Sequence, residues 1–225
     1  MNLLAIETST ESGSIALWCD GRLLRRSCPA GAAHSQTLLP LLGSALQEAG
    51  LGYGDLHGIA FAAGPGSFTG LRIACGVAQG LAVAHSLPVI AVGTLEAMAL
   101  ASGGERVIVL LDARMGEVYH SRVVAGTEAL PPAVCRPDAL PVPDTEGWLA
   151  CGNGLAAHPL LRQRLSQWVR DWLPDLLPDA GAVASLAAPR LARGEGVDAA
   201  AVAPLYVRNK VALTTAERLA TGGKA

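Results

Sequence analysis

A glycine-rich segment, residues 64–70 (GPGSFTG), has the composition of an anion-binding loop. It follows the apolar run 59–63, which is typical of a buried strand, and it leads into a helix of small residues. A glycine loop at this junction leaves backbone N–H groups free at the helix N-terminus, where they attract anions. The pattern is equally typical of a tight turn in which glycine supplies positive φ angles. Leu71 and Arg72 stand where a Walker A loop has Lys and Ser or Thr, so that motif is excluded. The spacing GxGxxxG also differs from the GxGxxG of a dinucleotide-binding fingerprint.

The other chemically active side chains lack the spacing of a metal or nucleophile motif. Five histidines are present: His34, His57, His85, His120 and His158. No two of them lie within five residues of each other, whereas a recognisable zinc site needs two ligands about one helical turn apart. Ser67 and Thr69 lack the G-x-S-x-G context of a nucleophile, so we expect them to cap the helix that follows. The sequence therefore predicts no catalytic residue, no metal and no cofactor.

The elements that must position the glycine loop follow the order βββαβαβα. Their predicted ranges are strands at 2–8, 13–18, 22–28, 58–63 and 88–92, helices at 35–49 and 69–86, and a helix from Thr94. This is the order of the ribonuclease-H-like half found in the superfamily of actin, Hsp70 and the sugar kinases. An α/β fold is expected.

The second half of the chain repeats that order imperfectly. Its predicted elements are strands at 107–111, 117–124 and 148–151, a Pro-rich loop or edge strand at 131–143, and a glycine loop at 152–154 before a helix. We therefore predict two ribonuclease-H-like domains, of which the second is degenerate. The expected boundaries are 1–102 for the first domain, 103–220 for the second, and 221–225 for a disordered tail.

Composition limits the class of protein. The chain has 17 Lys and Arg against 19 Asp and Glu, which argues against autonomous nucleic-acid binding. Its five cysteines form no CxxC pair and indicate reduced thiols in the cytoplasm. The stretch between Arg72 and Glu96 lacks charge, but Gln79, His85 and Pro88 interrupt it, so no membrane span is expected. These features predict a soluble, cytoplasmic protein.

Six short segments, spread over almost the whole chain, carry a family resemblance. They are 4–10 (LAIETST), 34–40 (HSQTLLP), 64–74 (GPGSFTGLRIA), 112–114 (DAR), 117–119 (EVY) and 203–208 (APLYVR). In order and spacing they resemble the TsaB (YeaZ) family, which belongs to the glycoprotease-like (peptidase M22-like) superfamily. The resemblance implies a role in making tRNA N6-threonylcarbamoyladenosine, as a non-catalytic subunit rather than an enzyme.

The resemblance also implies partners. TsaB-like proteins pair with a TsaD-like paralogue, which holds the metal and the active site, and a TsaE-like ATPase joins the assembly. Without the paralogue a homodimer is expected, and tRNA would be met only through the complex. An M22-type peptidase would instead need a bound metal.

The actin-like fold implies a cleft between the domains. In that superfamily an acidic residue at the end of each domain's first strand faces the cleft, and Glu7 and Asp112 stand at these places. Two such carboxylates could hold a hydrated Mg²⁺, whereas Arg114 near Asp112 indicates a salt-bridged turn instead. The residues assigned to a vestigial phosphate or nucleotide cleft are Glu7, Thr8, Gly64, Gly66, Ser67 and Asp112. The alternative function is therefore an actin-like ATP-binding protein or kinase.

Two helices could form a partner surface. The helix 35–49 carries a leucine stripe, and the helix from Thr69 to His85 is rich in small residues that allow close packing. Both helices could equally do no more than cover their own sheet. The resemblance favours an interface, for which the predicted residues are Leu38, Leu42, Leu46, Ile73, Val77 and Leu81.

Overall fold

The first domain is built on a five-stranded sheet of order β3-β2-β1-β4-β5. Its strands are β1 (Asn2–Glu7), β2 (Ser14–Cys19), β3 (Arg22–Ser27), β4 (Gly58–Gly64) and β5 (Val89–Gly93). The first three pair antiparallel, and β4 and β5 continue from β1 in parallel. Asp20 and Gly21 both have positive φ, as the tight turn between β2 and β3 requires. The expected meander and both parallel strands are confirmed in this computed structural model, which describes residues 1–208.

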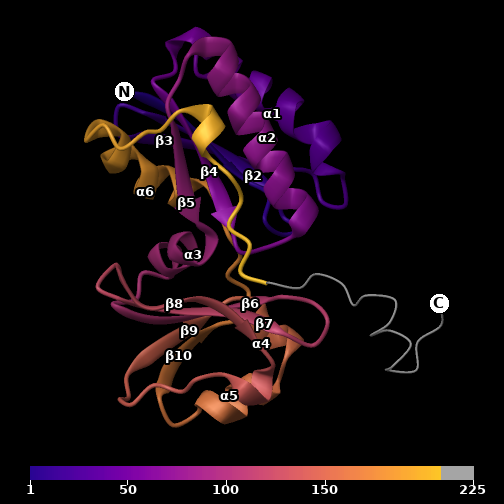
Figure 1. Ribbon diagram of the computed structural model, residues 1–225, viewed down its shortest axis with the longest axis vertical. Coiled ribbons are helices and arrows are strands. Elements are labelled where there is room, and N and C mark those ends of the chain that lie inside the picture. The colour runs from indigo at the N-terminus through magenta and orange to yellow at the C-terminus, as the bar shows by residue number, and fades with distance from the viewer. Residues whose placement is uncertain (209–225) are drawn as a thin grey trace, which may run out of the picture.

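The second sheet repeats the first. Its order is β10-β9-β6-β7-β8, and its strands are β6 (Arg106–Asp112), β7 (Val118–Val124), β8 (Thr127–Cys135), β9 (Trp148–Cys151) and β10 (Val169–Leu173). Again the first three strands pair antiparallel and the last two add in parallel. The Pro-rich stretch contributes the edge strand β8, where Pro131 and Pro132 remove few ladder bonds. The fold is thus an actin-like pair of ribonuclease-H-like domains (Figure 1).

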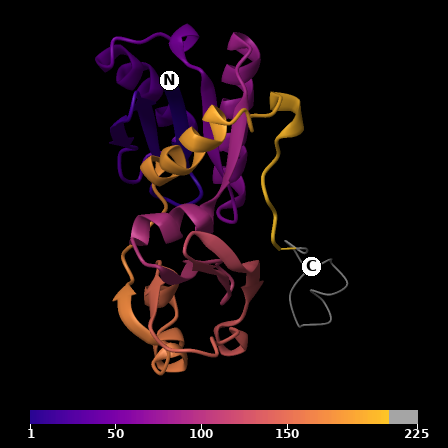
Figure 2. The same cartoon turned by 90° about the vertical axis from the view of Figure 1, so that its left-hand side faces the viewer.

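Helices cover both faces of the first sheet. α1 (His34–Glu48) and α2 (Phe68–His85) lie side by side on one face, and α6 (Ala180–Ala192) lies on the other (Figures 1 and 2). Because side chains alternate along a strand, Leu4 and Ile6 of β1 pack with α1 and α2, whereas Leu3 and Ala5 pack with α6. The sheet is therefore buried on both sides.

Shorter helices pack on the second sheet. α3 (Thr94–Ser102) packs on one face of the second sheet and lies between the two domains. The other two helices, α4 (Gly154–Ala157) and α5 (Leu160–Leu165), are only one or two turns long. The short 3-10 helices are η1 (Tyr53–Asp55), η2 (Pro137–Ala139) and η3 (Ala199–Ala201). The second domain is therefore degenerate in its helices and not in its sheet, which keeps all five strands.

The expected division into residues 1–102 and 103–220 needs a correction. After the second sheet the chain returns to the first: Asp179 caps α6, and the N–H of Ala180 donates to the hydroxyl of Ser14 on β2 at 2.9 Å. An alanine-rich helix buries its face on whichever sheet is uncovered, here the first. The expected tail at 221–225 lies outside the described residues. Within residues 1–208, none of the helices has the length and hydropathy to cross a bilayer.

Candidate functional site

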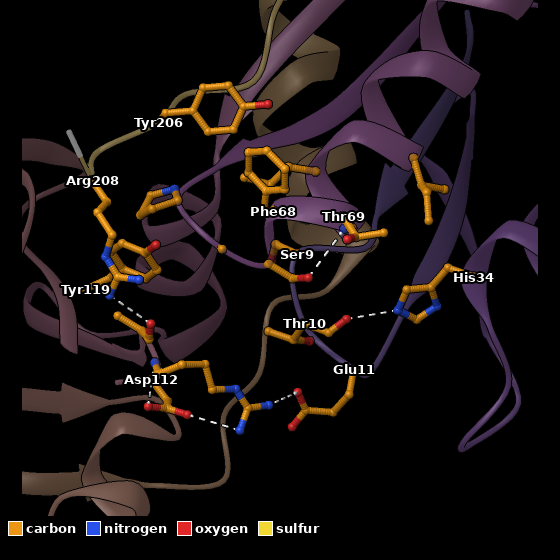
Figure 3. A pocket seen from close by; sticks show the side chains of 18 of the residues that line it. Ser9, Thr10, Glu11, His34, Phe68, Thr69, Asp112, Tyr119, Tyr206 and Arg208 are labelled. Carbon is orange, nitrogen blue, oxygen red and sulfur yellow. Dashed lines mark hydrogen bonds and ion pairs between the residues drawn. The ribbon is translucent and has the colours of Figure 1, made fainter. Parts of the chain in front are cut away.

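A cleft of about 540 Å³ lies between the domains (Figure 3). Its lining includes four segments, which are the loop after β1, the glycine loop at the start of α2, the turn after β6, and the chain from Leu205 to Arg208. Residues 33–35 at the start of α1, Tyr119 of β7 and Asn153 complete it. Ligand pockets of this volume suit a small organic molecule. The four segments come from both domains, so the geometry of the cleft depends on how the domains are held together.

The glycines of the loop are explained by close packing against the loop after β1. A Cβ on Gly66 would lie 2.5 Å from the Cβ of Ser9, and a Cβ on Gly70 would lie 1.8 Å from the carbonyl oxygen of Thr8. Thr8 Oγ1 also donates a hydrogen bond to the carbonyl of Gly70 at 2.8 Å. Neither glycine has a positive φ, so the turn interpretation holds only for Gly64, with φ of +125°.

The expected cap of α2 is confirmed at Ser67. Its hydroxyl accepts from the N–H of Gly70 at 3.4 Å, while its own N–H donates to the carbonyl of Ser9 at 2.7 Å. The N–H of Ser67 is therefore already occupied and is not available to bind an anion. The N–H groups of Phe68 and Thr69 have no acceptor within residues 1–208. Anion binding by the loop stays a prediction.

Glu7 does not face the cleft, which corrects its assignment to a nucleotide site. Its side chain is fully buried, one carboxyl oxygen accepts from the N–H of Ser9, and the other has no partner among the described residues. Burial raises the pKa of Glu7 to about 7. Hydrogen bonding from Ser9 offsets this rise only in part, and the nearby Asp179 carboxylate adds to it. Thr8 and Gly64 are also buried and do not line the cleft. Gly66, Ser67 and Asp112 do line the cleft.

The carboxylate of Asp112 is paired, as the salt-bridge interpretation of this turn expects. Its oxygens lie 3.4 Å from Arg114 Nη1 and 3.4 Å from His158 Nε2. Arg114 in turn reaches Glu11 of the first domain at 3.4 Å (Figure 3). With Glu7 turned away, the cleft lacks the two facing carboxylates of the expected Mg²⁺ site. Within residues 1–208, no three His, Cys, Asp or Glu side chains cluster as metal ligands.

The segment from Leu205 to Arg208, here called the strap, joins the two domains. The N–H of Leu205 donates to the carbonyl of Ala63 on β4 at 2.7 Å. At the other end, Arg208 pairs with Glu117 and donates to the carbonyl of Ala113 at 3.0 Å. A Cβ on Gly64 would lie 2.6 Å from the carbonyl oxygen of Leu205, so this glycine admits the strap. The strap lies within segment 203–208 of the family resemblance. That it connects the two domains could not be predicted, because this depends on tertiary contacts that no local sequence pattern shows.

The assignment of three of the six predicted interface residues to a partner surface is wrong, because these residues are buried. Leu38, Leu42 and Leu46 are almost completely buried and pack on the first sheet, so their side chains are not available to a partner. The stripe they form is the core face of α1. Ile73, Val77 and Leu81 of α2 are half-buried at the edge of the same core, and their place in an interface stays a prediction.

The outward face of α1 and α2 carries different residues. On α2, Gly76 and Gly80 are exposed, and a Cβ on either would meet nothing within 4 Å. Val83 is 73% exposed on α2 and Leu39 is 49% exposed on α1. We call the outward surface made by these four residues the α1–α2 face. Sequence spacing could have found its glycines, which recur at i and i+4.

Comparisons with known proteins give a consistent result. The family model described as "TsaD: tRNA N6-adenosine threonylcarbamoyltransferase" matches residues 29–148. The tRNA threonylcarbamoyladenosine biosynthesis protein TsaB of Escherichia coli (strain K12) is 36% identical over 226 residues, which cover 94% of this chain and 96% of that protein. The Haemophilus influenzae protein of the same name is 44% identical over 128 residues, or 55% of this chain and 54% of that protein. The solved structure titled "YeaZ from Pseudomonas aeruginosa" has a TM-score of 0.82 and 41% identity, and the match covers 91% of this chain and 99% of that chain.

Proposed function

Since the chain belongs to the TsaB (YeaZ) family, we propose that it acts in tRNA threonylcarbamoyladenosine biosynthesis as a non-catalytic subunit. It binds a TsaD-like paralogue through the α1–α2 face and supports transfer of the threonylcarbamoyl group to the adenosine beside the anticodon. In the absence of that paralogue, the same face pairs two copies of this chain. A TsaE-like ATPase and the tRNA join through the complex.

The observation that carries the proposal is the pair of exposed glycines on α2. Glycine in a helix interior costs about 0.5–1 kcal/mol relative to alanine, and neither Gly76 nor Gly80 has a neighbour that would exclude a Cβ. The fold of this chain therefore does not explain them. A second helix that packs closely on α2 does, because small residues let two backbones approach. Val83 and Leu39 would supply apolar contact beside them.

The non-catalytic part of the proposal is supported by the cleft. Glu7 is buried, and the Asp112 carboxylate forms an ion pair with Arg114. An actin-like ATPase or kinase positions Mg²⁺ with carboxylates that face the phosphates, so the alternative function is less well supported. A non-catalytic subunit can support its paralogue by stabilising the active conformation. For this it needs only to bind that conformation better than another.

We expect Gly76→Arg and Gly80→Arg to weaken binding to the purified paralogue by at least 100-fold. An arginine at either position would hold the partner helix away, while the open space around each Cβ lets the chain fold normally. Ala101→Arg, at an exposed position of α3, is the matched control and should bind as the wild type does. Calorimetric titration gives the affinities. Wild-type affinity in both glycine variants would overturn the proposed face.

A further inference from the structure

Phe68, Arg72 and Tyr206 form an ordered cluster at the rim of the cleft. The rings of Phe68 and Tyr206 are 5.6 Å apart, and the guanidinium carbon of Arg72 lies 3.7 Å from the centre of the Phe68 ring. Arg72 Nε donates to the hydroxyl of Tyr206 at 3.0 Å. The guanidinium is therefore held from two sides, by a stacked ring and by a hydrogen bond, and it has little rotamer freedom left to lose on binding.

This cluster is exposed although it is ordered. Phe68 is 42% exposed, Tyr206 is 44% exposed, and the neighbouring Leu205 is 46% exposed. Arg72 is exposed as well, and its two terminal nitrogens have no acceptor or ion-pair partner within residues 1–208. A planar guanidinium with both terminal nitrogens free presents a fork that matches a carboxylate in two parallel hydrogen bonds.

The cluster continues the α1–α2 face. Phe68, Arg72, Gly76 and Gly80 are spaced by four residues along α2 and therefore share one side of the helix. A helix that packs on the two glycines would extend toward Arg72 at the N-terminal end of α2. Aromatic residues and arginine are also the types that dominate the energy of protein interfaces.

We infer that Arg72, held by Phe68 and Tyr206, anchors a carboxylate side chain of the protein partner that docks on the α1–α2 face. This inference rests on the proposed function, and it adds the chemistry of one contact. Leu205 precedes Tyr206 on the strap and is 46% exposed, so a partner that docks on the anchor would cover it as well and exclude water there. Exclusion of water around a charge-assisted hydrogen bond strengthens it.

A protein carboxylate fits this site better than an RNA phosphate does. RNA backbones are bound by several cations in a row, and this chain has a formal net charge of −2. The other arginines beside the cleft are already paired, Arg114 with Asp112 and Glu11, and Arg208 with Glu117. The side of α2 next to Arg72 is formed by glycines, which suit a packed helix.

The test measures the affinity of the full chain for its purified paralogue at low and high salt. Arg72→Lys keeps the charge and loses the fork, so we expect binding to weaken at least tenfold at both salt concentrations, while its salt dependence, which follows the charge, stays close to that of the wild type. Arg162→Lys is the matched control, because Arg162 is also exposed over an aromatic ring, with its guanidinium carbon 5.4 Å from the centre of the Trp172 ring. That variant should bind as the wild type does.

A second pair of variants tests whether the exposed apolar side chain of Leu205, next to Tyr206 on the strap, is part of the contact. Leu205→Arg should weaken binding at least tenfold and leaves the backbone bond from Leu205 to Ala63 in place. Leu160→Arg, at a leucine of α5 that is 47% exposed, should have no effect. Unchanged thermal melting in all four variants shows that folding is not the cause of a loss.

The outcomes separate this inference from the proposed function. If Gly80→Arg abolishes binding while Arg72→Lys and Leu205→Arg keep wild-type affinity, the anchor is wrong and the α1–α2 face stands. If Gly76→Arg and Gly80→Arg both bind normally, the proposed face is wrong. If Arg72→Lys leaves paralogue binding intact and instead weakens binding of tRNA by the complex, the cluster contacts RNA and the inference is overturned.

Discussion

Gly70→Ala should destabilise the protein by on the order of 4 kcal/mol, a large part of the roughly 5–15 kcal/mol by which folded proteins are stable. The added Cβ would lie 1.8 Å from the carbonyl oxygen of Thr8, and that contact is with rigid backbone. To relieve it, the loop after β1 and the start of α2 must separate, which also breaks the buried bond from Thr8 Oγ1 to the carbonyl of Gly70. Urea unfolding at neutral pH measures the free energy of unfolding.

Gly76→Ala is the control for this prediction, because it makes the same change in the same helix. Here the Cβ meets nothing within 4 Å, and the helix gains propensity, so stability should rise by about 0.5–1 kcal/mol. Equal stability of the two variants would show that the packing of Gly70 against Thr8 does not govern the fold.

Glu7→Gln should remove a pH dependence that the wild type shows. Burial raises the pKa of Glu7 to about 7 in the folded protein, against 4.5 for the ordinary carboxyl. Between these values the folded state binds more protons than the unfolded state, so the free energy of unfolding falls as pH rises from about 4.5 through 7. The full shift corresponds to about 3 kcal/mol. Below pH 4.5 both states are protonated, and this contribution to stability is fully present.

The measurement is urea unfolding of both proteins at pH 5 and pH 8. The wild type should be less stable at pH 8 by up to about 3 kcal/mol. The glutamine variant, which keeps an acceptor for the N–H of Ser9, should lack that part of the loss. Parallel pH profiles would mean that Glu7 is not held in the fully buried position described here.

Much of the fold could be predicted because its signals are local. The runs of apolar residues in β1 and β4, the turn at Asp20 and Gly21, and the glycine loop before α2 each show in a few consecutive residues. The repeat of this order also predicts the second sheet. The ranges predicted from the sequence do not include β10 or α6. α6 is an alanine-rich helix, and the sheet that it covers is formed about 90 residues or more earlier in the chain, so no local pattern shows where it packs.

The site was harder to predict because it depends on which face of an element is covered. The spacing of Leu38, Leu42 and Leu46 predicts a shared face, but the same spacing suits a core and an interface. The position of Glu7 at the end of β1 predicts proximity to the cleft, and only the packing of the loop after β1 turns its side chain inward. The strap could not be placed from its sequence, since its partners Ala63 and Glu117 belong to different domains.

The central claim is that this chain supports tRNA threonylcarbamoyladenosine synthesis through its α1–α2 face. Nucleoside mass spectrometry of bulk tRNA tests it most directly, in cells that are depleted of the protein and then complemented. We expect the modified nucleoside to disappear on depletion, to return with the wild type and with Ala101→Arg, and to stay absent with Gly80→Arg. An unchanged level after verified depletion would contradict the account, and full rescue by Gly80→Arg would contradict the role of the face.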